Sequence, residues 1–374
     1  MGTTTTTTTN RVGAAFASAL AVIMLVGACT TGGTSGGGSD ASTPTPPVTS
    51  GPATTPPPAA ESPVTELGVD CAGLLAPATA TAFDASWAPR DHYDRDGITP
   101  SDYAIAQEGG LSCTWNDGAS SDGKNNPTEG SAYSGLLVQA LPHATGEWPQ
   151  FVEIYGDDPD GRCFGDTTFR GCTFDQLIDD TWVSISATNF EPSVEATPEQ
   201  RFATIVAEVT EVVSSADVAD APWPLGGPAR PWSCVAGAAL EREALGGGDE
   251  LFVLTPGGGW SVYAAAWSRA VATSCSILAG TTPYSDESVL TGGAWALDQR
   301  IDFGLVDPET AVTVAGLADG DRAYRSCSAV RCVTDLVLGD DWVRLAVDRA
   351  TVPDTEAASD RLVEGYVARA EASA

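Results

Sequence analysis

Hydrophobic and polar residues alternate along two short stretches of the chain, 182–188 and 342–348. The apolar face of each stretch is aliphatic and consists of Val183, Ile185 and Ala187 in the first and of Val343, Leu345 and Val347 in the second. A period of two with one apolar face predicts a half-buried β-strand. An aspartate pair precedes each stretch, at 179–180 and at 340–341, the second after Gly339, and these residues favour the tight turn of a hairpin.

Hydrophobic residues follow each of these strands at helical spacing, over 202–213 and over 362–367. Before the first of these stripes, the sequence TPEQ at 197–200 has the N-cap, the first-position proline and the glutamine of a capping box. An apolar stripe of this period predicts an amphipathic helix. We therefore expect a helix at the C-terminal end of each half of the chain.

Each half also begins with helical signals that are followed by strands. Asp70 and Pro77 predict a capped helical turn and a second helix, because proline at the first helical position loses no needed hydrogen bond. The segment 233–245 has the same part in the second half. The sequences GLSCTW at 110–115 and AYSGLLVQALP at 132–142 are typical of two strands joined by a long connection.

The cysteines show that these two halves are copies of one module. Eight of them fall into two quartets: Cys71, Cys113, Cys163 and Cys172, then Cys234, Cys275, Cys327 and Cys332. Their spacings are 42, 50 and 9 residues in the first quartet and 41, 52 and 5 in the second. Trp182 and Trp342 each stand ten residues after the last cysteine, and Arg201 and Arg361 each nineteen after the tryptophan. Landmarks that keep the same phase indicate a tandem repeat.

The expected fold class is α+β, with two disulfide-stapled domains in tandem. Each domain is expected to be an antiparallel sheet with flanking N- and C-terminal helices. We place the first repeat at 67–218, a linker at 219–229 and the second repeat at 230–374.

The N-terminus predicts export. Arg11 is the only charge before an apolar run that ends at Ala28, and this run is shorter than the roughly 20 residues of a spanning helix. The sequence Val26-Gly27-Ala28-Cys29 resembles the bacterial lipobox, in which the cysteine is diacylated and becomes the first residue of the mature chain. We therefore expect a signal peptide at 1–28 and a lipid anchor on Cys29. The alternative is an ordinary signal peptide with a chance cysteine.

A tether is expected between this anchor and the folded part. Residues 29–66 consist largely of threonine, glycine, serine, alanine and proline, a composition that cannot bury a core. The expected location is the extracytoplasmic face of the cell membrane, where acyl chains hold the protein. Scarce lysine beside abundant alanine, glycine and arginine is typical of a high-GC actinobacterial genome.

Export also decides how the cysteines are interpreted. An even set in an oxidising compartment is expected to form disulfides, and eight cysteines allow 105 pairings, or three in each repeat if the repeats fold alone. The favoured pairs are Cys71 with Cys113, Cys163 with Cys172, Cys234 with Cys275 and Cys327 with Cys332. Zinc is the alternative, but the chain has no Cys-x2-Cys and both histidines lie outside the cysteine clusters.

The net charge of −32 narrows the kinds of partner. Such a surface repels nucleic acid and anionic lipid, so a charged partner is expected to be basic, or a divalent cation. The simpler interpretation is that the excess acid keeps an exported protein soluble.

A family resemblance rests on the first repeat. The pattern Asp70-Cys71-x-x-Leu74-Leu75-x-Pro77, followed by GLSCTW, resembles actinobacterial cell-envelope lipoproteins of unknown function with a C-x-W strand. It is also distantly similar to the two-disulfide extracellular sensor domain of mycobacterial serine/threonine kinases. The second repeat departs from the pattern, with Ile277 in place of the tryptophan. The resemblance implies a non-enzymatic envelope protein with a binding cleft, and it carries over no catalytic residue.

Signals for catalysis are scarce. His92 and His143 lack a partner motif and are expected to be exposed, and the chain has no H-E-x-x-H, phosphate loop or dinucleotide motif. The acid pairs 157–158, 179–180 and 340–341 are expected to be solvated turns. We therefore expect no enzyme and no cofactor.

Two weaker candidates for binding remain. Asp91, Asp94 and Asp96 are a weak candidate for a loosely bound cation, although the loop lacks the ligands of an EF-hand. Trp182, Trp342 and Trp260 are candidate aromatics of a binding groove, against the alternative that the first two pack beneath a helix. Trp260 belongs to GGGWSVYAAAW, 257–267, which we expect to be a loop and a buried strand.

The expected function is that of an exported, lipid-anchored module that binds a ligand or an envelope protein without catalysis. The competing hypotheses are a hydrolase that uses acidic residues and a spacer without a ligand. A carboxylate within reach of His92 or His143 in a cleft would favour the hydrolase, and an apolar groove between the repeats would favour binding.

Overall fold

The structure is a computed structural model of the 374-residue chain. It describes residues 62–95, 97–118, 134–156, 161–165, 170–193, 196–219, 239–255 and 259–373. The chain divides into two units, Met1–Thr55 and Pro56–Ala374, and the described residues all belong to the second. The expected signal peptide, the anchor Cys29, most of the tether, Cys234 and all of the linker after Ala219 lie outside the described residues.

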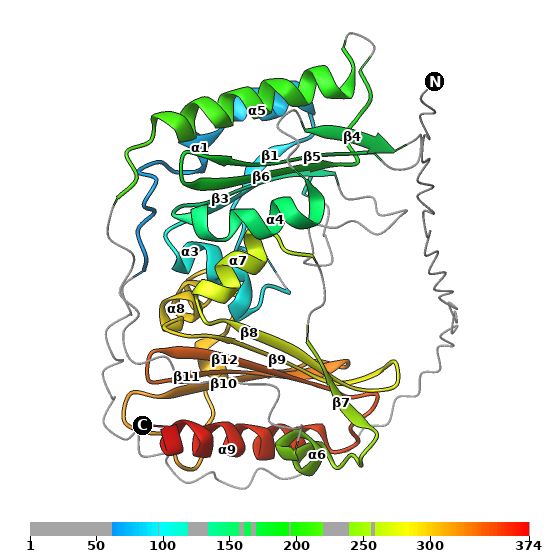
Figure 1. The fold of residues 1–374 in the computed structure, drawn as a ribbon. Helices are drawn as coiled ribbons and strands as arrows, with labels where there is room; N and C mark the ends of the chain where they lie inside the picture. Colours follow the sequence, from blue (N-terminus) through cyan, green and yellow to red (C-terminus); the bar gives the residue numbers. More distant parts are fainter. Residues whose placement is uncertain are drawn as a thin grey trace, which may run out of the picture. The chain divides into compact units, whose positions relative to one another are not determined.

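Two antiparallel sheets, each with six strands, form the centre of this unit (Figure 1). The first has the order β1-β2-β3-β6-β5-β4 and the second the order β10-β11-β12-β9-β8-β7. Helices flank both sheets, which confirms the expected α+β fold with one sheet in each repeat. The strands of the first sheet are β1 (Ala88–Arg90), β2 (Leu111–Asn116), β3 (Gly135–Leu141), β4 (Arg162–Gly165), β5 (Arg170–Ile178) and β6 (Thr181–Thr188). Those of the second are β7 (Leu251–Leu254), β8 (Thr273–Ala279), β9 (Thr282–Leu290), β10 (Arg322–Cys327), β11 (Arg331–Leu338) and β12 (Asp341–Asp348).

The helices lie in three layers around the sheets (Figure 1). On the outer face of the first sheet lie α1 (Cys71–Leu74), α2 (Pro77–Phe83) and α5 (Pro198–Ser215). On the outer face of the second lie α6 (Ala239–Leu245) and α9 (Thr355–Ser373). Between the sheets lie α3 (Ala104–Gln107), α4 (Trp148–Tyr155), α7 (Val262–Arg269) and α8 (Ala294–Asp302), with the 3-10 turns η1 (Pro100–Tyr103) and η2 (Ala144–Gly146). A third 3-10 turn, η3 (Pro308–Thr310), precedes β10.

Local signals in the sequence explain where several elements begin. The Asp70 carboxylate accepts a hydrogen bond from Gly73 N at 2.7 Å and caps α1, and Pro77 opens α2. Thr197 and Gln200 form the expected capping box of α5, with N···O distances of 3.0 and 3.3 Å. Both hairpin turns form as expected, with positive φ angles of 54° at Asp179 and 64° at Gly339.

The two sheets keep the same register around the duplicated strands. Cys172 lies opposite Ala187 in the first sheet, and Cys332 lies opposite Val347 in the second. Both pairs are separated in sequence by fifteen residues. The structural repeat therefore follows the sequence repeat residue by residue from the last cysteine of each quartet to the end of the next strand.

Disulfides join three of the favoured pairs. They are Cys71–Cys113, Cys163–Cys172 and Cys327–Cys332. Cys275 is also disulfide-bonded, and its favoured partner Cys234 lies outside the described residues. Cys71–Cys113 fastens α1 to β2, whereas the two short-range bridges each join neighbouring strands.

Three hydrophobic cores fill the spaces between these layers. The first lies between the first sheet and its outer helices, and the third lies between the second sheet and α6 and α9. The middle core contains residues of both repeats, among them Tyr103 and Trp182 from the first and Ala265 and Trp342 from the second. The repeats therefore bury apolar surface against one another, and this interface is a packed core rather than the apolar groove considered above.

Hydrogen bonds cross the same interface. Tyr263 Oη donates to Asp102 Oδ1 at 2.8 Å, and Trp267 Nε1 donates to Ser101 O at 2.7 Å. Tyr103 lies at the centre: its ring stacks on Tyr93 at 4.2 Å between centroids and meets the edges of Trp295 and Trp342.

The segment 257–267 is where the predicted strand is wrong. Ser261 caps a helix instead, accepting a hydrogen bond from Ala264 N at 3.2 Å, and α7 follows. Short apolar runs fit a strand and a helix equally well by periodicity. Val262, Ala265 and Ala266 are buried on the face of α7 that enters the middle core, so packing against the first repeat decides the helix.

Candidate functional site

Two of the three candidate groove aromatics are core residues. Trp182 and Trp342 are both 0% exposed. Trp182 packs against Trp148 and Phe151 of α4, while Trp342 packs against Tyr103 from the other repeat. The groove hypothesis is wrong for this pair, because the second face of each sheet is covered by helices and by the other repeat.

Each of these tryptophans has the same polar partner. Trp182 Nε1 donates to Asp175 Oδ1 at 3.2 Å, and Trp342 Nε1 donates to Asp335 Oδ1 at 2.9 Å. Burial raises the pKa of the Asp175 carboxyl to about 6, although hydrogen bonds from Ser184 and Trp182 oppose the shift. The sequences CTFDQLIDDTW and CVTDLVLGDDW thus each form a hairpin in which an aspartate of one strand accepts the hydrogen bond of a buried indole in the next. We interpret this contact as stabilising the fold.

Trp260 is half-buried at the interface between the repeats. Its Nε1 donates to Glu147 O of the first repeat at 2.9 Å, and its ring packs on the middle core. Trp260 therefore helps to fasten the repeats together and does not line an open groove.

The two histidines differ from each other, and His92 differs from expectation. His92 is buried, with Nδ1 2.9 Å from Thr114 Oγ1. Burial lowers its pKa to about 3, with Arg95 adding to the effect, so the ring is neutral at physiological pH. The prediction of an exposed His92 fails because the loop that carries it folds under Tyr93 into the middle core.

His143 is partly exposed and meets two carboxylates. Its Nδ1 lies 2.9 Å from Asp180 Oδ2, and its Nε2 lies 3.1 Å from Glu66 Oε2 and 3.2 Å from Ala219 O. Burial alone lowers the pKa of the imidazole, but the hydrogen bonds to Ala219 and Asp180 raise it more, so the net shift is upward. Both ring nitrogens are occupied by these contacts, which tie the start of the first repeat to Ala219 after its last helix, at the beginning of the expected linker.

The candidate cation loop is only partly described. Asp91 and Asp94 are exposed, and Asp91 Oδ1 accepts a hydrogen bond from Tyr93 N at 2.9 Å. Asp96 lies outside the described residues, so a cation at this loop stays a prediction from the sequence.

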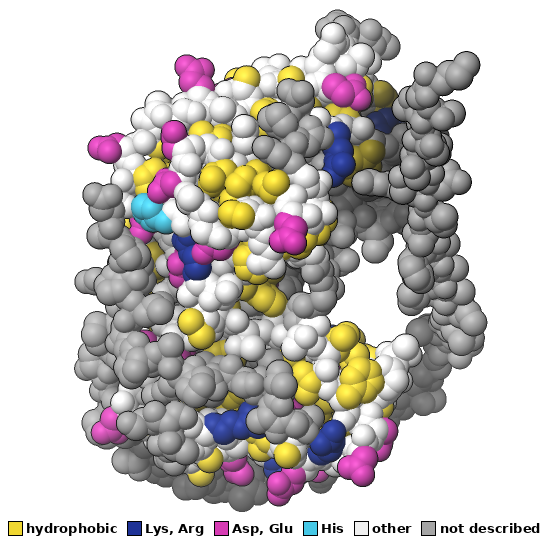
Figure 2. Space-filling view, viewed as in Figure 1, with side chains coloured by type: hydrophobic (Ala, Val, Ile, Leu, Met, Phe, Trp, Pro, Cys, Tyr) yellow, Lys and Arg dark blue, Asp and Glu magenta, His cyan; other side chains and the backbone are white. Residues whose placement is uncertain are grey.

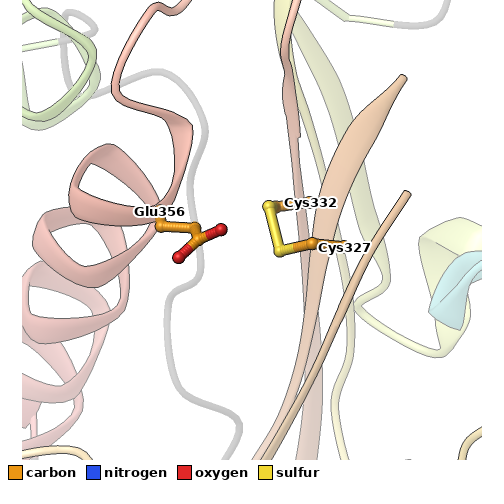
Figure 3. A group of neighbouring side chains, drawn as sticks. All are labelled: Cys327, Cys332 and Glu356. Carbon is orange, nitrogen blue, oxygen red and sulfur yellow. A yellow bond between two sulfur atoms is a disulfide. The ribbon is translucent and has the colours of Figure 1, made fainter. Parts of the chain in front are cut away.

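One group of side chains has the spacing of metal ligands: Cys327, Cys332 and Glu356 (Figure 3). The two sulfur atoms are bonded to each other, so neither is a thiolate that binds metal. Glu356 projects from α9 toward the disulfide, and its Oε1 lies 3.1 Å from Arg349 Nη2.

Buried carboxylates occur in the third core, where sequence reasoning proposed none. Glu287 and Glu241 are each 1% exposed, and Tyr366 Oη donates to Glu287 Oε2. Arg369 Nη2 lies 3.7 Å from Glu241 Oε1. Burial raises the pKa of Glu287 to about 7, with Glu241 adding to the shift. Glu287 lies opposite Cys275 in the strand register. Its position beside a cysteine on the inward face of an alternating strand is the sequence signal that could have indicated a buried carboxylate.

Exposed apolar side chains gather at one end of the first sheet. Ile154 is 52% exposed and Tyr155 is 46% exposed at the end of α4, and Phe164 is 50% exposed on β4. Figure 2 shows hydrophobic side chains over α4 and beside β4, where arginine side chains lie next to them. We call the surface formed by Ile154, Tyr155, Arg162 and Phe164 the α4–β4 surface.

Two hollows flank β4 on this surface. One, of about 190 Å³, lies toward α5 and is lined by Phe164, Arg170, Phe190 and Glu199 among others. The other, of about 30 Å³, lies toward α4 and is lined by Tyr155, Arg162, Thr173 and Asp175 among others. Each hollow combines an aromatic ring with one basic and one acidic side chain.

The edge strands β4 and β10 occupy the same place in the two sheets, and among the described residues only β10 has a further segment along its outer edge. In the second repeat, Ala311 pairs with Tyr324 and Val312 N donates to Ala323 O at 2.9 Å, so the chain covers β10 at Ala323 and Tyr324, before the Cys327 end of the strand that matches β4 in register. Between α8 and β10 the chain has residues 303–321 for this purpose, whereas between α4 and β4 it has only 156–161. Within the described ranges, no segment pairs with the outer edge of β4.

None of the helices among the described residues is long and apolar enough to cross a membrane. Comparisons of the chain with protein-family models, with curated proteins and with solved structures each gave no match.

Proposed function

We propose that this chain is an exported, lipid-anchored envelope protein that binds an extended segment of a partner protein along β4, without catalysing a reaction. The observation that carries the proposal is that β4 lies between two hollows and that, within the described ranges, no segment pairs with its outer edge, whereas Ala311 and Val312 pair with part of β10. Addition of a strand to an open edge is a common mode of peptide recognition.

The backbone of β4 offers the polar groups for this contact. Cys163 and Cys172 lie directly opposite each other with Cα atoms 4.0 Å apart, the close spacing of a pair without mutual hydrogen bonds. In such a pair the N–H and C=O groups point away from the neighbouring strand. Cys163 therefore presents a donor and an acceptor to an added strand.

The hollow toward α5 would select side chains of that strand, whereas the hollow toward α4, at about 30 Å³, has room for little more than a water molecule. Successive residues of an extended peptide point to opposite faces of a sheet, so alternate side chains would meet the hollow toward α5 and those between them would lie over the hollow toward α4. Because each hollow has one basic and one acidic lining residue, the apolar anchors decide affinity more than net charge does. The strongly acidic remainder of the chain favours partners that are basic outside the docked segment.

Anchoring at the membrane is the other half of the proposal and is supported by the sequence around Cys29. Removal of the thiol by Cys29→Ala should move the protein from the membrane fraction to the soluble fraction, because acyl chains supply most of the membrane affinity. Intact-mass measurement of the native protein should show the added acyl groups. A native mass without them would refute the anchor and leave the β4 site untouched.

Peptide binding can be tested with a displayed library of short unconstrained peptides and the mature protein. We expect the selected peptides to lose at least about tenfold in affinity for Phe164→Lys, because a charge replaces an apolar anchor. Phe252→Lys is the matched control, since Phe252 is an exposed aromatic on the edge strand β7 of the other sheet. Both variants should keep the melting temperature of the parent within a few degrees.

Backbone contacts provide a second readout. N-methylation at alternate residues of a selected peptide should abolish binding in one register and spare it in the other, as strand pairing requires. Hydrogen exchange of the Cys163 amide should be fast in the free protein and slow in the complex. Peptides that ignore Phe164→Lys, or a Cys163 amide already protected in the free protein, would overturn the proposal in favour of a spacer without a ligand.

A further inference from the structure

The disulfide Cys327–Cys332 differs in exposure at its two ends. It joins β10 to β11 beside a short turn, and Cys327 is exposed whereas Cys332 is 0% exposed. Arg349 Nη2 lies 3.5 Å from Cys332 Sγ and also binds Glu356 (Figure 3 shows the disulfide and Glu356). Solvent therefore meets the disulfide at the Cys327 end, and a cation lies beside the sulfur of Cys332.

We propose that Cys327 is a site of reversible modification by low-molecular-weight thiols, with Cys332 as the leaving sulfur. This inference does not depend on the peptide-binding proposal, because it concerns the other repeat.

The exchange proceeds in two steps. A thiolate attacks Cys327 Sγ, a new S–S bond forms to the external thiol, and the Cys327–Cys332 bond breaks with its electron pair on Cys332 Sγ. A second thiol molecule then attacks the external sulfur of this mixed disulfide and releases the oxidised small thiol, and the Cys327 thiolate takes a proton from water. Two small thiols are oxidised and one protein disulfide is reduced.

Arg349 and Glu356 act on this exchange in opposite senses. A guanidinium next to a sulfur lowers the pKa of the thiol, and a thiol of lower pKa leaves faster. The Glu356 carboxylate partly neutralises Arg349 and lies near the same sulfur, so it opposes the developing negative charge. Arg349 is thus a positioning residue for the leaving thiolate, and Glu356 moderates it.

The first repeat provides the comparison within the same molecule. Its equivalent bridge, Cys163–Cys172, packs into the first core, and Cys163 is partly buried. At the sequence offset of 160 residues, Asn189 and Ala196 correspond to Arg349 and Glu356, with Ala196 just before α5 and Glu356 in the first turn of α9. Cys327 and Cys332, by contrast, are not members of the third core. Opening the second bridge should therefore be the faster reaction and should leave the fold intact.

The rate of opening can be measured on the mature protein with glutathione as the probe thiol, followed by alkylation and peptide mapping. Trypsin cuts after Arg325 and Arg331, which places Cys327 and Cys332 in different peptides. We expect the glutathione adduct on Cys327, and we expect Cys327–Cys332 to open at least about tenfold faster than Cys163–Cys172.

Two variants replace residues beside the second-repeat disulfide with those found at the corresponding sequence positions of the first repeat. Arg349→Asn should slow the opening about tenfold, and Glu356→Ala should speed it about threefold, with both effects reduced in high salt. Far-UV circular dichroism of each variant checks the fold, and the two effects have opposite signs, so general destabilisation cannot produce both. An adduct on Cys332, equal rates for the two bridges, or a rate unchanged by both substitutions would overturn the proposal.

Discussion

The two repeats share one sheet architecture but fill the space beneath the C-terminal helix differently. In the first, Val138 lies between Cys113 and Ile185 on neighbouring strands and faces an apolar core. In the second, Glu287 occupies this position between Cys275 and Leu345 and hydrogen-bonds to Tyr366. The repeat thus preserved register and chain path while the polarity of one core layer changed.

The middle core teaches a second difference. The ring of Trp182 in the first repeat packs against Trp148 and Phe151 of α4 in the same repeat, whereas the ring that meets Trp342 of the second is Tyr103 of the other repeat. The second repeat therefore depends on the first repeat for part of its core.

The largest effect on stability is expected for a substitution that places in the first core the carboxylate found at the equivalent position of the third core. Val138→Glu buries a carboxylate beside apolar neighbours, and we expect the free energy of unfolding to fall by about 3 to 5 kcal/mol. Chemical denaturation measures the change. The reciprocal Glu287→Val should cost no more than about 1 to 2 kcal/mol, because it removes a desolvated carboxyl and leaves only the Tyr366 hydroxyl without its acceptor. Similar losses for the two variants would refute the comparison.

Removal of Tyr103 should rank next. Tyr103→Ala deletes a buried ring that contacts Trp295 and Trp342, and we expect a loss of about 3 to 4 kcal/mol. Because the ring crosses between repeats, hydrogen exchange should accelerate along β12 of the second sheet as well as near η1. Acceleration confined to the first repeat would show that the second does not rely on it.

Glu287 should make stability depend on pH. Its pKa is about 7 in the folded protein and 4.5 without the fold, so the folded state favours the protonated acid. The stability it contributes is complete below pH 4.5 and is lost as pH rises through 7, with a total on the order of 3 kcal/mol. Glu287→Gln should flatten this part of the profile. A profile that keeps its slope in the variant would assign the effect elsewhere.

His92 should give the first repeat the opposite dependence. Its pKa falls from 6.5 to about 3 on folding, so the folded state favours the neutral ring. The stability that follows is complete above pH 6.5 and declines as pH falls toward 3. Melting temperatures of His92→Gln and the parent, compared at several pH values, should converge in acid.

The smallest difference concerns the two indole acceptors. Asp175→Ala and Asp335→Ala each remove the partner of a buried tryptophan N–H, at a cost of about 1 to 3 kcal/mol. Asp335→Ala should cost more, because Arg344 lies 3.8 Å from Asp335 and would lose its carboxylate. Equal losses would mean that Arg344 adds nothing to this pair.

Much of the fold followed from local sequence signals. The alternation at 182–188 predicted β6, TPEQ predicted the start of α5, and the cysteine spacing predicted three bridges that the structure contains. These signals extend over a few residues or occur in both repeats, so they can be recognised in the sequence without a tertiary structure.

The candidate peptide-binding site at β4 could not be predicted from the sequence in this way. The sequence suggested Trp182 and Trp342 as groove residues, yet both are buried, and the proposed site lies at β4 with the exposed Phe164, whose outer edge pairs with no segment of the described residues. An edge strand is defined by what fails to pair with it, and the sequence of β4 contains no information about Ala311 covering β10 in the other repeat.

The amino-acid sequence by itself determined the duplication, the strand and helix caps and the pairing of the short-range disulfides, because each depends on neighbours along the chain. Only the tertiary structure decided that α7 is a helix, that His92 and Glu287 are buried and that the repeats close on a common core. Those outcomes depend on which face of each sheet the other repeat covers, and that choice is made by packing between residues more than a hundred positions apart.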